Sequence, residues 1–128
     1  MSKTLSIDDL YTDTGTFDEQ IVLQALHQKV AFTKENDILF TSDPTKMKPR
    51  DVILLFALAK KILKVHSKIE ADIITNAELI DKTKVNKNTI NVNIMRLKEK
   101  KLLIASGVGY EIPMFKVNEA LSLLTESN

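Results

Sequence analysis

The sequence predicts a mainly helical protein with a small β component. Apolar residues recur at helical spacing in five separate segments. Two further stretches are short, rich in β-forming residues and interrupted by turn residues, which is typical of hairpins. The 128 residues are 44% hydrophobic and 27% charged, as in an ordinary globular protein. We divide the chain into a tail (1–16), an N-terminal helix and hairpin extension (17–44) and a main domain (45–128).

The N-terminal third combines a polar tail, one helix and one pair of short strands. Residues 1–16 are polar and predict a mobile tail. Apolar residues then recur from Ile21 to Leu26, which predicts an amphipathic helix over roughly 17–28. In 29–42, two runs rich in Val, Ile and Phe lie on either side of a polar turn, which favours a hairpin or a pair of extended segments.

A long helix is predicted over about 49–66, beginning at Pro49, since proline loses no hydrogen bond in the first turn of a helix. Most of its positions are apolar, which is typical of a central core helix. We expect only its basic residues to be exposed, namely Arg50, Lys60, Lys61 and Lys64. Residues 68–74 predict an extended or irregular connection to the next helix.

Two short helices separated by a brief turn are predicted after this connection. Thr75 and Glu78 have the spacing of a capping box, in which each side chain satisfies a free backbone donor, so a helix should cover 76–83. Asn86 is a second good cap, and it predicts a helix over 87–100. The apolar stripe of this second helix is narrow and consists of Ile90, Ile94 and Leu97.

The C-terminal part predicts a second hairpin and a last helix. Residues 102–106 and 110–112 contain β-forming residues, and the glycines in 107–109 permit a tight turn between them. This hairpin either closes the core as a simple edge or reaches out to a partner. A final amphipathic helix is expected over about 117–125, with its apolar face made of Val117, Ala120, Leu121 and Leu124.

The segment 77–103 resembles the winged-helix DNA-binding family found in many bacterial and archaeal transcription regulators. The resemblance rests on the first helix, the turn and the second helix, at Glu78, Leu79, Ile80, Val85, Asn86, Thr89, Ile90, Leu97, Leu102 and Leu103. Family members often have glycine where this chain has Lys84 and Lys101. The resemblance implies a winged helix-turn-helix fold over about 45–124, with double-stranded DNA as the partner and the helix 87–100 in the major groove.

The predicted recognition helix carries side chains suited to reading base edges. Asparagine can bond adenine, an apolar side chain can meet a thymine methyl group, and lysine can reach guanine. We expect base contacts from Lys87, Asn88, Thr89, Asn91, Val92 and Met95. We expect phosphate contacts from Lys82, Lys84, Arg96, Lys98, Lys100 and Lys101. The alternative for the asparagines is that they are ordinary solvated positions.

Charge is distributed unevenly along the chain. The net charge is only +1, but residues 1–43 hold three bases and eight acids, whereas residues 44–128 hold 15 bases and nine acids. Such asymmetry is one indication of a polyanionic partner for the basic part. A further possibility is that the acidic part folds over the basic face and blocks it.

No residue pattern predicts catalysis, so we expect a protein that is not an enzyme and has no cofactor, no metal and no small-molecule substrate. His27 and His66 are isolated and are expected at helix ends. There is no cysteine, which excludes disulfides and thiolate metal sites. No apolar run approaches the roughly 20 residues that span a bilayer, which favours a cytoplasmic protein without membrane contact.

Two partner types fit these features. The first is DNA, bound by a homodimer that pairs through the first or the last helix, at Phe17, Ile21, Leu26, Leu121 or Leu124. The alternative is a winged-helix protein-protein interaction module in a larger complex, because a fold does not dictate a function. The near-neutral net charge and the apolar Val92 and Met95 favour this alternative.

Overall fold

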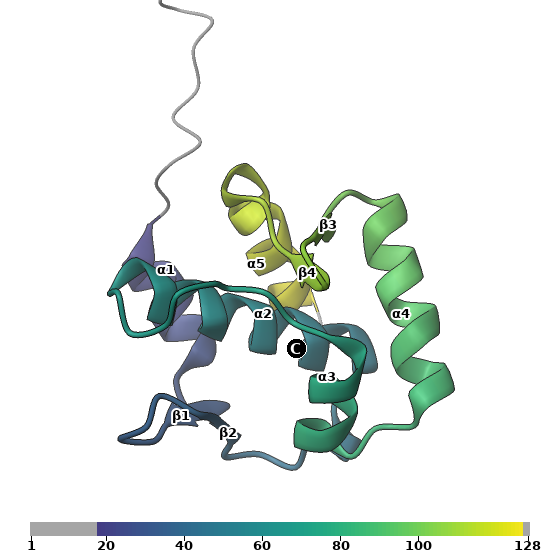
Figure 1. The fold of residues 1–128 in the computed structure, drawn as a ribbon, viewed down its shortest axis with the longest axis horizontal. Helices are drawn as coiled ribbons and strands as arrows, with labels where there is room; N and C mark the ends of the chain where they lie inside the picture. The colour runs from purple at the N-terminus through teal and green to yellow at the C-terminus, as the bar shows by residue number, and fades with distance from the viewer. Residues whose placement is uncertain (1–17, 127–128) are drawn as a thin grey trace, which may run out of the picture.

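The structure is a computed structural model that describes residues 18–126, and it is mainly helical with two small antiparallel hairpins (Figure 1). The five predicted helices and both predicted hairpins are present, whereas the predicted tail (1–16) lies outside the described residues. The elements are α1 (Glu19–Leu26), β1 (Val30–Phe32), β2 (Ile38–Phe40), η2 (Pro44–Lys46), α2 (Pro49–Val65), α3 (Asn76–Thr83), α4 (Lys87–Glu99), β3 (Ile104–Ser106), β4 (Gly109–Glu111), η3 (Met114–Lys116) and α5 (Val117–Glu126).

Helix α2 is the centre of the fold, and α1, α3, α4 and α5 all pack against it (Figure 1). It begins with Pro49 in its first turn and ends at Val65, and the N–H of the C-cap His66 donates to the last turn. Every side chain from Asp51 to Ala59 is buried, and Phe56 is among the largest of them. Because the helix is covered on nearly all sides, its role is that of a scaffold.

The predicted exposure of the basic residues of α2 holds for Lys64 only: Lys61 is 5% exposed, and Arg50 and Lys60 are half-buried. Lys61 Nζ lies 2.6 Å from Oδ2 of the buried Asp72, and Lys64 Nζ lies 3.5 Å from the other carboxylate oxygen. Segment 69–74 passes over this side of α2 and brings Asp72 with it, which makes burial of the lysine tolerable because a buried charge requires a partner. Lys60 is also paired, at 2.8 Å from Glu78 Oε2.

The second hairpin is tied to the segment that precedes α3. Ile74 and Tyr110 exchange two backbone hydrogen bonds of 2.8 Å, which add a one-residue bridge beside β4. The turn consists of Gly107 and Val108 alone, whereas the prediction also placed Gly109 in it. Gly109 belongs to β4, where a Cβ atom would overlap the carbonyl oxygen of Ile74. This close approach, and not a turn, is what requires glycine there.

The N-terminal extension packs against the scaffold helix. Asp18 caps α1, and Glu19 Oε1 accepts a 2.6 Å hydrogen bond from His66 Nε2 at the far end of α2. In the first hairpin, Phe40 stacks on Phe56 with ring centroids 6.3 Å apart. These contacts join residues 18–40 to the core of the main helical part.

The packing of α1 and α5 changes the set of residues that a dimer can use. Leu26 and Leu121 are buried, at 4% and 7% exposure, because both helices pack against α2 and against each other. Ile21 is 47% exposed, Leu124 is half-buried, and Phe17 lies outside the described residues. Within residues 18–126, no helix is both long and apolar enough to cross a membrane.

Candidate nucleic-acid interface

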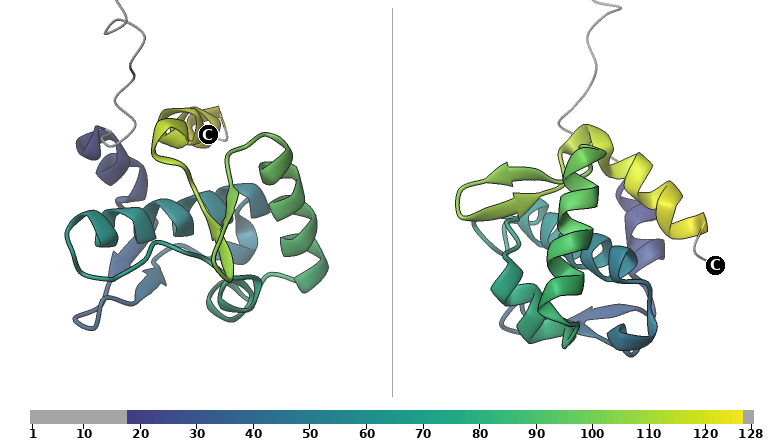
Figure 2. Two further views of the ribbon diagram at one scale, coloured as in Figure 1. Left: turned by 45° about the horizontal axis from the view of Figure 1, so that its top comes forward. Right: turned by 90° about the vertical axis from the view of Figure 1, so that its right-hand side faces the viewer.

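Helix α4 is held by one narrow side and leaves its other side uncovered. Ile90, Ile94 and Leu97 are at most 2% exposed and fix the helix to the core. Figure 2 shows α4 at the front of the molecule in its right-hand view, with the β3–β4 hairpin projecting on one side and α5 on the other. The outer face of α4 is therefore the part of this helix that a large partner can reach.

The junction between α3 and α4 is built from side chains that bond to the backbone. Thr75 Oγ1 accepts from the Glu78 N–H at 3.1 Å, as the capping box predicts, but the Glu78 carboxylate pairs with Lys60 instead of completing the box. Thr83 Oγ1 accepts from the Val85 N–H at 3.2 Å within the turn. Asn86 caps α4, with its Oδ1 accepting from the Asn88 N–H at 2.7 Å.

Lys84 and Lys101 both have the left-handed backbone conformation, with φ of 61° and 62°. Lys84 ends α3, and Lys101 follows the last turn of α4. These are the two positions at which the sequence departs from the glycines of the resembled family. The turns are thus made with lysine, which adopts this conformation at a cost of roughly 1 kcal/mol relative to glycine.

The six residues predicted to contact bases divide into two groups. Lys87, Asn88, Val92 and Met95 are exposed, with Val92 at 44% and Met95 at 62%. Thr89 and Asn91 are half-buried. Asn91 Oδ1 accepts a hydrogen bond from Asn76 Nδ2 and so helps to hold α4 against α3. Of the six, Asn91 is therefore partly committed to a contact inside the protein.

All six residues predicted to contact phosphates are exposed, namely Lys82, Lys84, Arg96, Lys98, Lys100 and Lys101. Lys84 Nζ lies 3.9 Å from Asp81 Oδ1, where both groups are exposed and their attraction is weak. Lys98 Nζ lies 5.3 Å from the centroid of the Tyr110 ring and so links α4 to the hairpin. Between residues 82 and 101 the sequence has only one acid, Glu99.

A basic cleft of about 270 Å³ lies between α4 and the beginning of α2, lined by Lys48, Pro49, Arg50, Asn93, Arg96, Leu97 and Lys100. Sequence reasoning missed the contribution of Lys48 and Arg50 because they are far from α4 along the chain. Arg50 was expected to be exposed, but it is half-buried and donates to the Leu123 carbonyl oxygen at 3.2 Å. No local pattern around either residue indicates this proximity.

The base of the β3–β4 hairpin carries two acids that interact with each other, Glu111 and Asp72, whereas its tip is apolar. Val108 at the tip is 91% exposed. At the base, burial and the negative charge of Asp72 raise the pKa of Glu111. Burial acts in the same sense on Asp72, but the hydrogen bond and charge of Lys61 outweigh it and lower the pKa of Asp72. The hairpin tip therefore offers shape and apolar contact but no cation.

Comparison with protein-family models, with curated proteins and with solved structures finds no match to this chain. The candidate site therefore rests on the geometry of α4 and on the resemblance that the sequence of 77–103 suggests. The geometry offers one exposed helix with basic side chains on both flanks.

Proposed function

We propose that the chain is a winged helix-turn-helix protein that binds double-stranded DNA and regulates transcription, with α4 in the major groove. One observation carries this proposal. The basic side chains of α2 are all paired with acids of the protein, whereas Lys87, Arg96 and Lys100 of the α4 region form no ion pair within residues 18–126. Cations left without acids on one exposed helix suit a polyanion.

The outer face of α4 offers groups that can read base pairs. Lys87 and Asn88 stand at its first turn, the part of a recognition helix that usually enters the groove most deeply. Val92 and Met95 follow on the same side and can meet thymine methyl groups. Asn91 keeps its amide nitrogen for a base while its oxygen holds Asn76.

Cations lie on both sides of this face and suit the two phosphate backbones that border a groove. On one flank, Arg96 and Lys100 line the cleft that they share with Lys48. On the other flank, Lys98 lies over Tyr110 beside the hairpin. Such contacts set the position of the helix and carry no sequence information.

We expect the regulator to act as a homodimer, because helix-turn-helix proteins commonly pair two half-sites. Among the residues of the predicted set that the structure describes, Ile21 on α1 is the exposed one. Light scattering of the free protein measures the dimer directly, and Ile21→Glu should yield monomers. A wild-type protein that is monomeric at high concentration contradicts this part of the proposal.

A protein partner for α4 is the second candidate, and the exposure of Val92 and Met95 favours it. Two adjacent apolar side chains on an outer face are typical of the centre of a protein interface. The near-neutral net charge of +1 points the same way. In this case α4 would be buried against another subunit, and its basic flanks would form the rim.

A mobility-shift assay with a random duplex at about 50 mM and about 200 mM salt tests the DNA proposal. Binding should fall by a factor of 10³ or more between the two, as for about six phosphate contacts. The double variant Lys87→Glu/Arg96→Glu should abolish retention while the circular dichroism spectrum is unchanged. Lys34→Glu in the exposed turn of the first hairpin makes the same type of charge change away from α4 and is the control.

The same experiment separates the two candidates. No retention of wild-type protein at low salt overturns the DNA proposal. If Val92→Ser/Met95→Ser removes a stoichiometric protein partner while duplex binding is absent throughout, the interaction module is the correct function. Retention that is indifferent to Lys87→Glu/Arg96→Glu places DNA on another surface.

A further inference from the structure

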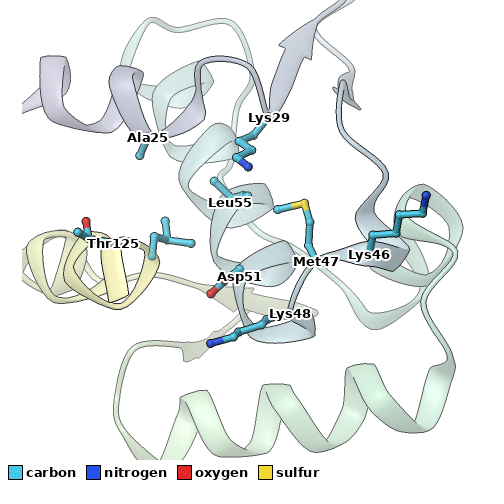
Figure 3. A pocket seen from close by; sticks show the side chains of 9 residues that line it. Ala25, Lys29, Lys46, Met47, Lys48, Asp51, Leu55 and Thr125 are labelled. Carbon is cyan, nitrogen blue, oxygen red and sulfur yellow. The ribbon is translucent and has the colours of Figure 1, made fainter. Parts of the chain in front are cut away.

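A second cavity, of about 420 Å³, lies away from the outer face of α4, where α1, α2 and α5 meet (Figure 3). Its lining comes from five stretches of the chain: Ala25, Lys29, Lys46, Met47, Lys48, Asp51, Leu55, Leu124 and Thr125. A volume of this size is within the range of pockets that hold small organic molecules. The proposed contacts of α4 with DNA leave this cavity unexplained.

The cavity combines apolar walls with two lysines at its edges. Ala25, Leu55 and Leu124 form apolar walls together with the thioether of Met47. Figure 3 shows Lys29 and Lys48 approaching the cavity from opposite sides, whereas Lys46 turns its ammonium group away. The side chain of Met47 extends toward Leu55 in Figure 3. Because methionine is flexible, it can adjust to apolar ligands of different shapes.

The charge of the cavity favours an anion. Lys29 is half-buried, and in the part of the chain that the structure describes neither Lys29 nor Lys48 forms an ion pair. The one acid in the lining, Asp51, is 6% exposed, and its Oδ1 lies 3.3 Å from Arg50 Nε. Because Arg50 offsets the charge of Asp51, the two lysines leave an excess of positive charge beside the apolar walls.

We propose that this cavity binds a small organic carboxylate with an apolar body. The carboxylate pairs with Lys29 and Lys48, and the apolar part displaces water from the surfaces of Leu55, Met47 and Leu124. Because Lys29 is half-buried, an ion pair formed with it is partly shielded from solvent and contributes more than an exposed pair does. Inorganic anions can use the lysines but not the apolar walls, and uncharged molecules can use only the walls.

The cavity also has a route to the proposed DNA interface, and this step rests on the proposed function. Lys48 lines both the carboxylate cavity and the basic cleft with Arg96 and Lys100. Arg50, beside it, bonds the Leu123 carbonyl oxygen on α5. A carboxylate that draws Lys48 into the cavity removes one cation from the cleft, so occupancy should weaken DNA binding.

Thermal unfolding of the full chain with 4-phenylbutyrate tests the site without DNA. The midpoint of unfolding should rise and saturate with 4-phenylbutyrate, because a ligand bound only to the folded state stabilises it. The alcohol 4-phenylbutanol and inorganic phosphate, which each lack one of the two features, should bind at least tenfold more weakly. Equal effects of phosphate and 4-phenylbutyrate overturn the proposal, since they show general binding of anions to lysines.

Variants place the effect in the cavity. Lys29→Gln and Lys48→Gln should each weaken 4-phenylbutyrate about tenfold, the effect of losing a charged hydrogen bond. Ala25→Leu fills the cavity and should abolish binding, whereas Lys34→Gln, in the exposed turn of the first hairpin, should not change it. Unchanged binding in the two cavity lysine variants overturns the site even if Ala25→Leu fails to fold. Failure to bind DNA leaves this assay unaffected, so the two proposals fail separately.

Discussion

Helices α2 and α4 lie against each other, yet they use their side chains in opposite ways. In α2, the side chains from Asp51 to Ala59 are all buried. In α4, only Ile90, Ile94 and Leu97 are buried. The rest of the protein covers α2 on nearly all sides. Helix α4 contacts the core through a narrow strip, and its wider outer face is exposed to solvent. The share of the helix surface that is buried thus distinguishes a scaffold helix from a helix that a partner can contact.

The two helices also treat their cations differently. Lys60 and Lys61 of α2 lie 2.8 and 2.6 Å from carboxylate oxygens of Glu78 and Asp72. Around α4, Lys87 and Arg96 have no such acid within residues 18–126. The comparison teaches that counting basic residues along the sequence overstates what a partner meets. The useful quantity is positive charge that the fold leaves unneutralised.

Truncation of an apolar residue in each helix should give the largest contrast. Leu58→Ala, at a position with 0% exposure, should cost about 3 to 4 kcal/mol in the free energy of unfolding, because a cavity remains in a packed core. Met95→Ala, at 62% exposure, should change it by less than about 0.5 kcal/mol. Urea unfolding followed by circular dichroism measures both. A large loss for Met95→Ala would mean that the outer face of α4 is packed.

Removal of the acid that neutralises α2 should have the next largest effect. Asp72→Ala leaves the buried Lys61 without a partner, which should destabilise the fold by about 3 kcal/mol. Asp81→Ala is the control, because its 3.9 Å pair with Lys84 is exposed and worth little. If Lys61→Met in addition to Asp72→Ala restores stability, the loss comes from the uncompensated charge. Equal losses for both acids would contradict the distinction drawn between the two helices.

The five α-helices and the two hairpins were predictable because each has a local signal. Pro49 and Thr75 indicate helix starts and lie directly before or within the helical sequences themselves. Helix α2 begins at Pro49, and Thr75 is the N-cap of α3. Asn86 is equally local as a cap of α4. Periodicity identified the buried strip of α4 correctly because a strip needs only the spacing of its own residues.

What the sequence could not predict depends on distant residues. The pattern of its own helix predicts that Lys61 is exposed. Its actual partner, Asp72, comes from segment 69–74, which passes over this side of the helix. The requirement for glycine at position 109 likewise comes from the carbonyl group of Ile74. In the candidate site, exposure of Lys87 and Asn88 followed from the helix pattern, whereas the bond between Asn91 and Asn76 did not.

The left-handed lysines allow a smaller test, in which stability and binding should move in opposite directions. Lys84→Gly and Lys101→Gly should each stabilise the fold by up to about 1 kcal/mol, since glycine adopts positive φ without steric cost. Lys82→Gly lies within α3 and should instead destabilise it by roughly the same amount. The two stabilised variants should bind duplex DNA more weakly, with a smaller salt dependence. Unchanged DNA binding would show that these lysines have no part in it.

The smallest effect is expected from the charges where the hairpin meets α2. Glu111 faces Asp72 as well as Lys61 and Lys64, and burial together with Asp72 raises its pKa. A carboxyl whose pKa is raised by folding binds protons more tightly in the folded state, so it lowers stability as pH rises through and above its ordinary value of 4.5. Asp72 acts oppositely, because its lowered pKa adds stability that is lost as pH falls below its ordinary value of 3.8.

Glu111→Gln should therefore remove the loss of stability above about pH 4. The loss of stability at lower pH, which comes from Asp72, should remain. The stability of Glu111→Gln relative to the wild type should increase as pH rises from 4 to 7. The stability of Asp81→Asn, which alters an exposed pair, should follow that of the wild type at every pH. Urea midpoints at several pH values measure this difference. A gain in stability that is independent of pH would mean that the substitution acts through packing of the side chain. It would contradict an electrostatic interaction between Glu111 and the charges beside α2.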